Sequence, residues 1–147
     1  MKKLFTLAFA ALLTGSLFAN TPDAIVNEKV LKVFLSTFSG AEDVNWTEEE
    51  NIYSVKFTHQ GVRSTVKYDE DGNFLSSLRY YDPSQLPVDV LCKLKKKFPE
   101  KTAFGVTEYT IGDEVNFYVK MEDAKNWITV KVDNYRAYVV TEKFKKA

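Results

Sequence analysis

The chain has 147 residues, of which 20 are basic and 20 acidic, and it contains a single cysteine. Balanced charge argues against a nucleic-acid or anionic-membrane binder that works through bulk charge, and one cysteine excludes an intramolecular disulfide. A chain of this length buries roughly two-thirds of its unfolded surface, and 14% of its residues are aromatic. We therefore expect one domain that is stabilised by a packed core.

Residues 1–19 have the pattern of a secretory signal peptide. Lys2 and Lys3 precede an apolar run from Leu4 to Leu13, and a small residue, Ala19, follows. The run is too short to span a bilayer, so we expect cleavage after Ala19, export to the periplasm or the medium, and no stable membrane insertion afterwards. The remaining residues carry 18 basic and 20 acidic side chains, a formal charge of −2.

Two amphipathic helices are predicted, because apolar residues recur at three- and four-residue spacing in two segments. The first begins at Thr21-Pro22 and ends at Gly40, and the second begins at Leu86-Pro87 and ends at Pro99. The two stripes consist of Val26, Val30, Leu31, Phe34, Leu35 and Phe38, and of Val90, Leu91, Leu94 and Phe98.

Alternation of apolar and polar residues predicts eight strands. Between residues 51 and 58, for example, Tyr53, Val55 and Phe57 alternate with polar residues, which indicates a sheet with one buried and one wet face. Asp71-Gly72 is a strong signal for a tight hairpin turn. The strands are expected at 42–47, 51–58, 62–69, 73–81, 104–111, 115–121, 126–133 and 137–144.

The order of one helix and four strands occurs twice, and individual residues recur with it. Val30, Leu31, Phe34 and Phe38 lie 60 residues before Val90, Leu91, Leu94 and Phe98, and Val66, Tyr68, Asp69 and Phe74 lie 64 residues before Val130, Val132, Asp133 and Tyr138. An offset that grows along the chain is expected for a duplicated unit with loop insertions. We therefore expect a single domain over 20–147 that consists of two repeats, 20–82 and 83–147.

Short structural motifs extend over this domain. They are the Phe34/Phe38 helix end, Val-x-Trp at 44–46, Val-Lys-Tyr-Asp-x-x-Gly at 66–72 and Leu-Pro at 86–87. With them the chain resembles the periplasmic PepSY-like proteins, also described as β-lactamase-inhibitor-like (BLIP-like). The resemblance implies an α+β fold, a tandem repeat of one helix followed by a four-stranded antiparallel sheet, and no established activity. The chain lacks the disulfide-forming cysteines of the named inhibitor, so we do not carry over that inhibitor's target.

No catalytic constellation or cofactor motif is found in the sequence. The acidic segment Asp69 to Asn73 lacks the ligand spacing of an EF-hand and is predicted to be a plain turn. His59, the only histidine, is predicted to be an exposed turn residue. For Cys92 two interpretations stay open: a partly exposed thiol that forms an intermolecular disulfide or is a redox target, and a small, half-buried, inert residue. We therefore predict a protein that is not an enzyme and binds no metal or cofactor.

The remaining functional signal is the outer face of the sheet, which points away from the helices. If Tyr53, Val55, Phe57, Val66, Tyr68, Phe74 and Leu78 face the helices, basic and aromatic side chains face outward. Arginine with tyrosine or tryptophan is typical of binding surfaces, although basic residues also protect open sheets from aggregation. The predicted binding residues are Arg63, Lys67, Arg79, Tyr81, Tyr118, Lys120, Trp127 and Lys131.

Two functional hypotheses follow from these observations. The first is an exported, non-enzymatic binding module that engages an acidic protein or peptide through the outer face, with inhibition of an enzyme as one form of this role. The second is a carrier of a small apolar molecule in a pocket between helices and sheets. Nucleic acid is not an expected partner.

Overall fold

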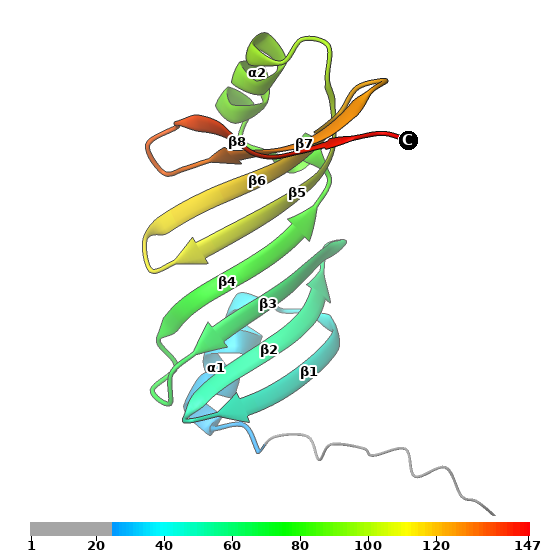
Figure 1. The fold of residues 1–147 in the computed structure, drawn as a ribbon. Helices are drawn as coiled ribbons and strands as arrows, with labels where there is room; N and C mark the ends of the chain where they lie inside the picture. Colours follow the sequence, from blue (N-terminus) through cyan, green and yellow to red (C-terminus); the bar gives the residue numbers. More distant parts are fainter. Residues whose placement is uncertain (1–24) are drawn as a thin grey trace, which may run out of the picture.

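The computed structural model describes residues 25–147, so the predicted signal peptide lies outside the described part. Eight antiparallel strands form one sheet in chain order, with two α-helices and a short 3-10 helix, η1 (Figure 1). The strands are β1 (Glu42–Glu49), β2 (Ile52–His59), β3 (Val62–Tyr68), β4 (Phe74–Tyr81), β5 (Thr102–Ile111), β6 (Glu114–Glu122), β7 (Asn126–Val132) and β8 (Tyr138–Lys145), and the helices are α1 (Glu28–Thr37), η1 (Pro83–Gln85) and α2 (Val88–Lys97).

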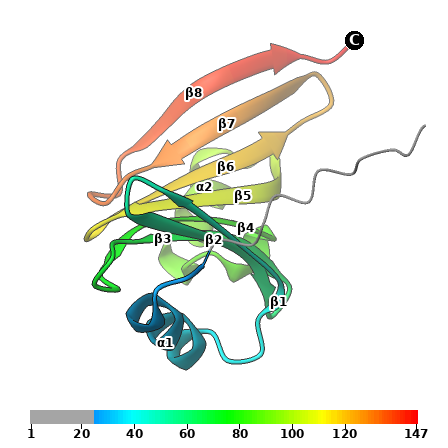
Figure 2. The ribbon, with the colours of Figure 1, turned by 90° about the horizontal axis from the view of Figure 1, so that it is seen from below.

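The predicted α+β class and the eight strands are confirmed. The expected division into four-stranded sheets is corrected, because β4 and β5 pair directly, from Ser76 opposite Ile111 to Tyr81 opposite Val106. The strands therefore belong to one continuous sheet. The sheet is strongly twisted, and β1 and β8 cross at a wide angle when the molecule is seen from below (Figure 2).

Helix α1 begins later than the sequence predicts. Residues 25–27 are not helical, and the side chain of Asn27 accepts a hydrogen bond from the backbone N–H of Lys29 at 2.9 Å. Asparagine is among the best N-cap residues, because its side chain satisfies a backbone donor that the first helical turn leaves free. The helix therefore does not include residues 25–27, contrary to the prediction, while its predicted start at Thr21-Pro22 lies outside the described residues. Val26 packs against the core from outside the helix.

Each α-helix covers its own apolar cluster on the sheet. Helix α1 places Val30 and Phe34 against β2 and β3, and α2 places Val90 and Leu94 against β6 and β7. Both helices lie on the same face, because one register row runs from Ser64 through Arg79 and Glu108 to Phe117. Ser64 lies on the α1 side of the sheet and Phe117 in the α2 cluster. The opposite face carries no helix among residues 25–147.

A β-bulge in β4 changes which of its side chains face the helices. Lys67 pairs with Ser76, but the next residue of β3, Tyr68, pairs with Phe74. Leu75 is therefore an extra residue, and the alternation reverses after it. This is why the expectation that Phe74 and Leu78 share the helix side is wrong: Leu78 pairs with Thr65 and lies on the outer face.

The β3–β4 turn is built around Asp69 and rests on α1. The carboxylate of Asp69 accepts hydrogen bonds from the backbone N–H groups of Asp71 and Asn73, both at 2.9 Å. Lys29 on α1 pairs with Asp71 at 2.7 Å. The hydrogen bonds of this segment are those of a turn, as the sequence predicts.

Candidate functional site

Six of the eight predicted binding residues lie on the outer face. On β3, Arg63 and Lys67 alternate with the buried helix-side residues Val62, Ser64 and Val66, so they point the other way. The same argument holds on β6 and β7, where the helix-side residues are Phe117, Val119, Met121, Ile128, Val130 and Val132. The six outer-face residues are Arg63, Lys67, Tyr118, Lys120, Trp127 and Lys131.

Arg79 and Tyr81 do not belong to the outer face, which corrects the sequence-based placement. Arg79 pairs with Ser64 and Glu108, and Tyr81 pairs with Val106, all on the helix side. The cause is the bulge at Leu75, which places odd-numbered residues of β4 toward the helices. A single sequence does not reveal this extra residue, because Phe74 and Leu78 taken alone give an unbroken alternation.

A register row on the outer face joins the two halves of the sheet. In it Arg63 lies opposite Tyr80, Tyr80 opposite Thr107, Thr107 opposite Tyr118, and Tyr118 opposite Lys131. We call this the outer row. Strands are spaced about 4.8 Å apart, so the two cations stand roughly 19 Å from each other across the row. Two tyrosines and a threonine lie between them, and tyrosines flanked by basic residues are typical of protein-binding surfaces.

Tyr80 and Tyr109 are outer-face residues that the sequence reasoning missed. Tyr80 is 43% exposed and Tyr109 36% exposed, and Tyr109 lies opposite Leu78 and Asn116. Tyr80 lies on β4 and Tyr109 on β5, the two strands at which the halves of the sheet meet. No sequence signal would have found Tyr80, because the alternation through Phe74 and Leu78 places even-numbered residues of β4 on the helix side.

The outer face is hollowed over β1 to β4, in what we call the outer groove. The groove has a volume of about 1160 Å³, enough for several side chains of a partner. Its lining consists of outer-face residues together with Phe57 and Ser64 of the helix-side rows: Asp43, Thr47, Glu49, Glu50, Ile52, Ser54, Lys56, Phe57, Thr58, Arg63, Ser64, Thr65, Lys67, Leu78 and Tyr80.

Charges in the outer groove are sorted by strand. The basic residues Lys56, Arg63 and Lys67 lie on β2 and β3. The acidic residues lie on β1 and at its turn to β2, and they are Asp43, Glu49 and Glu50. All three basic residues are exposed, and none takes part in a salt bridge within residues 25–147. Their charges are therefore available to a partner's carboxylates without first breaking an ion pair.

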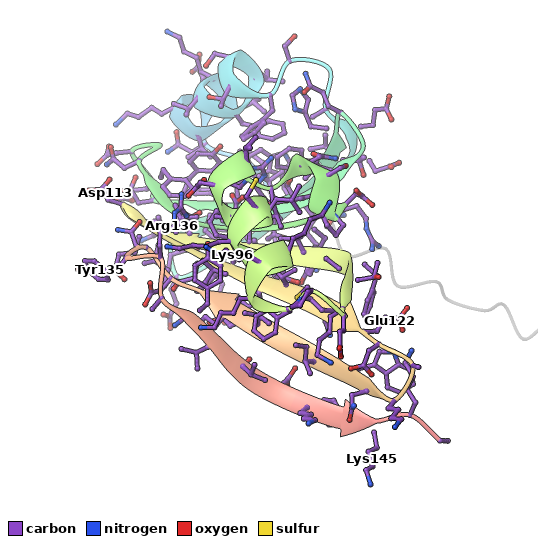
Figure 3. The ribbon with its side chains drawn as sticks, turned by 90° about the horizontal axis from the view of Figure 1, so that it is seen from above. Lys96, Asp113, Glu122, Tyr135, Arg136 and Lys145 are labelled. Atoms are coloured by element: carbon purple, nitrogen blue, oxygen red, sulfur yellow. The ribbon has the colours of Figure 1, made fainter. Side chains whose placement is uncertain are left out.

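Trp127 is tied into the C-terminal part of the outer face. Its indole Nε1–H donates to Oε2 of Glu122 at 2.9 Å, and Lys146 donates to the same oxygen at 2.8 Å. The ammonium of Lys146 also lies 5.3 Å from the centre of the indole. Hydrogen bonds from Lys146 and Trp127 hold the pKa of Glu122 below its usual value. Figure 3 shows Glu122 near Lys145 at one end of the sheet, away from Asp113 and Tyr135.

A second hollow lies on the helix side, beside α1, and we call it the α1 cleft. Its volume is about 420 Å³. It is lined by Val33, Thr37, Phe38, Ser64, Val66, Tyr68, Gly72, Phe74, Ser77, Arg79 and Glu108. At its floor Arg79 donates to Oε1 of Glu108 at 3.1 Å, and the hydroxyl of Tyr81 donates to Oε2 at 2.6 Å. Burial, with the bond to Glu108 second, raises the pKa of Tyr81.

His59 and Cys92 line neither hollow. Nε2 of His59 lies 3.2 Å from the carbonyl oxygen of Ser39, and the ring packs edge-on to Phe38, so His59 is half-buried rather than an exposed turn residue. Cys92 is exposed on α2, so it is not the half-buried residue of the second interpretation. Within residues 25–147 no three potential metal-binding side chains gather, and no helix there is long and apolar enough to span a membrane.

Comparison with known proteins relates the chain to others through its fold. No family profile matches the chain, and no curated protein does. Solved structures do match: a BLIP-like protein from Bacteroides fragilis has a TM-score of 0.56 and 15% identity, over 80% of this chain and 84% of the other. A DUF2874 family protein from Bacteroides ovatus has a TM-score of 0.55 and 13% identity, over 80% of this chain and 86% of the other. The resemblance to BLIP-like proteins therefore holds at the level of the fold.

Proposed function

We propose that the protein is an exported, non-enzymatic binding module that engages an acidic protein or peptide through the outer face of its sheet. The observation that carries the proposal is the outer row, in which two cations flank the exposed Tyr80 and the half-buried Tyr118 on a helix-free face. Tyrosine buries a large area at small entropic cost, and arginine pairs with carboxylates through two hydrogen bonds.

The outer groove gives this face a shape that suits a partner. A hollow of about 1160 Å³ beside Arg63 and Tyr80 is large enough to receive side chains that project from a protein surface or a bound peptide. Unpaired Lys56, Arg63 and Lys67 favour a segment rich in Asp and Glu. Among proteins of this fold, one is described as BLIP-like, and inhibition of an enzyme is accordingly one form that binding takes in our proposal.

Export and duplication complete the proposal. The N-terminal pattern of residues 1–19 supports secretion, and a Bacteroides eggerthii protein of the same fold, with a TM-score of 0.55 and 11% identity over 80% of this chain and 87% of the other, is named as a candidate periplasmic protein. Equivalent turns support duplication over 20–82 and 83–147: Asp133 accepts hydrogen bonds from the backbone of Tyr135 and Ala137, as Asp69 does from Asp71 and Asn73.

The test is photo-crosslinking in envelope extract, with a photoreactive residue in place of Tyr80. A charge-reversed outer face, Arg63→Glu with Lys131→Glu, should capture the partner at least tenfold less, since loss of a hot-spot residue costs about 2 kcal/mol. The matched control, Lys95→Glu with Lys96→Glu, makes the same charge change on exposed positions of α2 and should leave capture unchanged. Equal capture by both variants, or capture of no specific protein, contradicts the proposal.

A further inference from the structure

The α1 cleft lies where neither α-helix covers the sheet. Helix α1 packs on β2 and β3 and α2 on β6 and β7, whereas the cleft floor includes Ser77 and Arg79 of β4 and Glu108 of β5. Its walls are apolar and come from Val33 of α1, from Phe38 just after α1, and from the sheet and the β3–β4 hairpin. Phe74, on that hairpin, is 42% exposed. An elongated apolar group could thus gain burial there.

One end of the cleft carries an oriented cation. Arg79 is held by its hydrogen bond to Glu108, and its guanidinium carbon lies 5.4 Å from the ring centre of Tyr81. Only one of its nitrogens makes a hydrogen bond within residues 25–147. A guanidinium has five N–H donors in a planar fork, so the side chain retains donors for a ligand.

Exposure decides the sign of the charge that a ligand meets. The side chain of Arg79 is 42% exposed and that of Glu108 only 14%. Both oxygens of Glu108 already accept hydrogen bonds, from Arg79 and Tyr81. The carboxylate is thus occupied and largely covered, while the guanidinium remains accessible. A planar fork of this kind matches the two oxygens of a carboxylate.

We infer that the α1 cleft binds a small amphipathic monocarboxylate, a medium-chain fatty acid or a molecule of like shape, with its carboxylate on Arg79 and its hydrocarbon chain between α1 and Phe74. A volume of about 420 Å³ falls within the range of small-molecule sites. This site lies on the helix side and is independent of the outer face, so either proposal can fail without the other.

The experiment is isothermal titration calorimetry of the exported chain with decanoate, below its critical micelle concentration. Decanol, which has the same chain without the charge, is the matched ligand. The variants are Arg79→Gln, which removes the cation, Arg79→Lys, which keeps the charge but loses the fork, and Val33→Phe, which fills the cleft. Arg63→Gln makes the same change on the outer face and is the control. Chemical shifts of backbone amides during the titration locate the site.

We expect decanoate to bind saturably to the parent chain and decanol to bind at least tenfold more weakly. Decanoate should bind at least tenfold more weakly to Arg79→Gln and to Val33→Phe, and more weakly to Arg79→Lys than to the parent chain. Its affinity for Arg63→Gln should be unchanged. Amide shifts should gather on α1, β3 and β4. Should Arg79→Gln not fold, Arg79→Lys and Val33→Phe decide. The inference is overturned by absence of saturable binding, by equal affinity for decanol, by unchanged affinity of the Arg79 and Val33 variants, or by shifts that map to the outer groove.

Discussion

Single residues in two hairpin turns connect the sheet to the helix that covers it. Gly72 has a φ of +84°, and Arg136, 64 residues later, has a φ of +63°. Arg136 pairs with Asp89 of α2 at 3.0 Å, and in the first half Asp71, the residue before Gly72, pairs with Lys29 of α1, which lies 60 residues before Asp89. The turn-to-helix ion pair is thus present twice with its charges exchanged. Figure 3 shows Arg136 beside α2.

Gly72 is the residue whose replacement we expect to cost most in these turns. A Cβ at this position would lie 3.2 Å from Cγ2 of Val33 and 3.4 Å from the carbonyl oxygen of Lys29. Gly72→Ala should lower the free energy of unfolding by about 2 to 3 kcal/mol, since left-handed strain and a clash with α1 add. Urea denaturation followed by circular dichroism measures the loss.

Gly61→Ala is the control for this prediction. Gly61 has a similar φ of +76°, but nothing lies within 4 Å of its Cβ position. Its replacement should therefore cost about 1 kcal/mol, from backbone strain alone. Equal losses for the two variants would show that the β3–β4 turn does not pack on α1 as described.

At the scale of elements, the sequence predicts where the strands lie but not which face of the sheet each side chain of β4 occupies. All eight strands lie within two residues of their predicted bounds, because alternation over a half-buried sheet is a strong local signal. The bulge at Leu75 is not visible in that signal, and it moved Arg79 and Tyr81 to the helix side. The cap at Asn27 was also missed, because the apolar stripe from Val26 onward indicates a helix that already includes this residue.

The β6–β7 turn offers a test of stability against pH. Asp123 accepts hydrogen bonds from Lys101 of the segment before β5 and from the backbone of Lys125 and Asn126. These bonds, that of Lys101 first, hold the pKa of the Asp123 carboxyl well below its usual value. A carboxylate with a lowered folded pKa binds fewer protons when folded, so its contribution is present at neutral pH and is lost on acidification.

Asp123→Asn should therefore lower stability at pH 7 and make the decline below about pH 4 shallower than in the parent chain. Thermal unfolding midpoints measured between pH 7 and pH 2 give both quantities. Asp113→Asn removes the same charge from the β5–β6 turn and controls for net charge. Parallel curves for the parent chain and Asp123→Asn would mean that Asp123 does not contribute through its ionisation.

Across the whole molecule, two apolar clusters are joined by a polar seam. The cluster under α1 and the cluster under α2 have no buried residue in common. Between them lie the β4–β5 ladder and the hydrogen bonds of Glu108 with Arg79 and Tyr81. Each half alone is near the size at which a domain becomes marginal, and separation would expose the hydrogen-bonding edges of β4 and β5. The seam should therefore make the halves unfold together.

Two tryptophans allow this coupling to be measured, one in each half. Trp46 packs edge-on to Phe34 in the α1 cluster, and Trp127 bonds to Glu122 in the other half. In the variants Trp46→Phe and Trp127→Phe, the remaining tryptophan reports urea unfolding of its own half. We expect coincident transitions, as for a two-state domain. Glu108→Ala leaves Arg79 and Tyr81 without their acceptor, so it should lower the free energy of unfolding reported by each tryptophan alike, by about 1 to 3 kcal/mol. Transitions at different urea concentrations in these two single-tryptophan variants would instead mean that the two halves of the continuous sheet unfold independently.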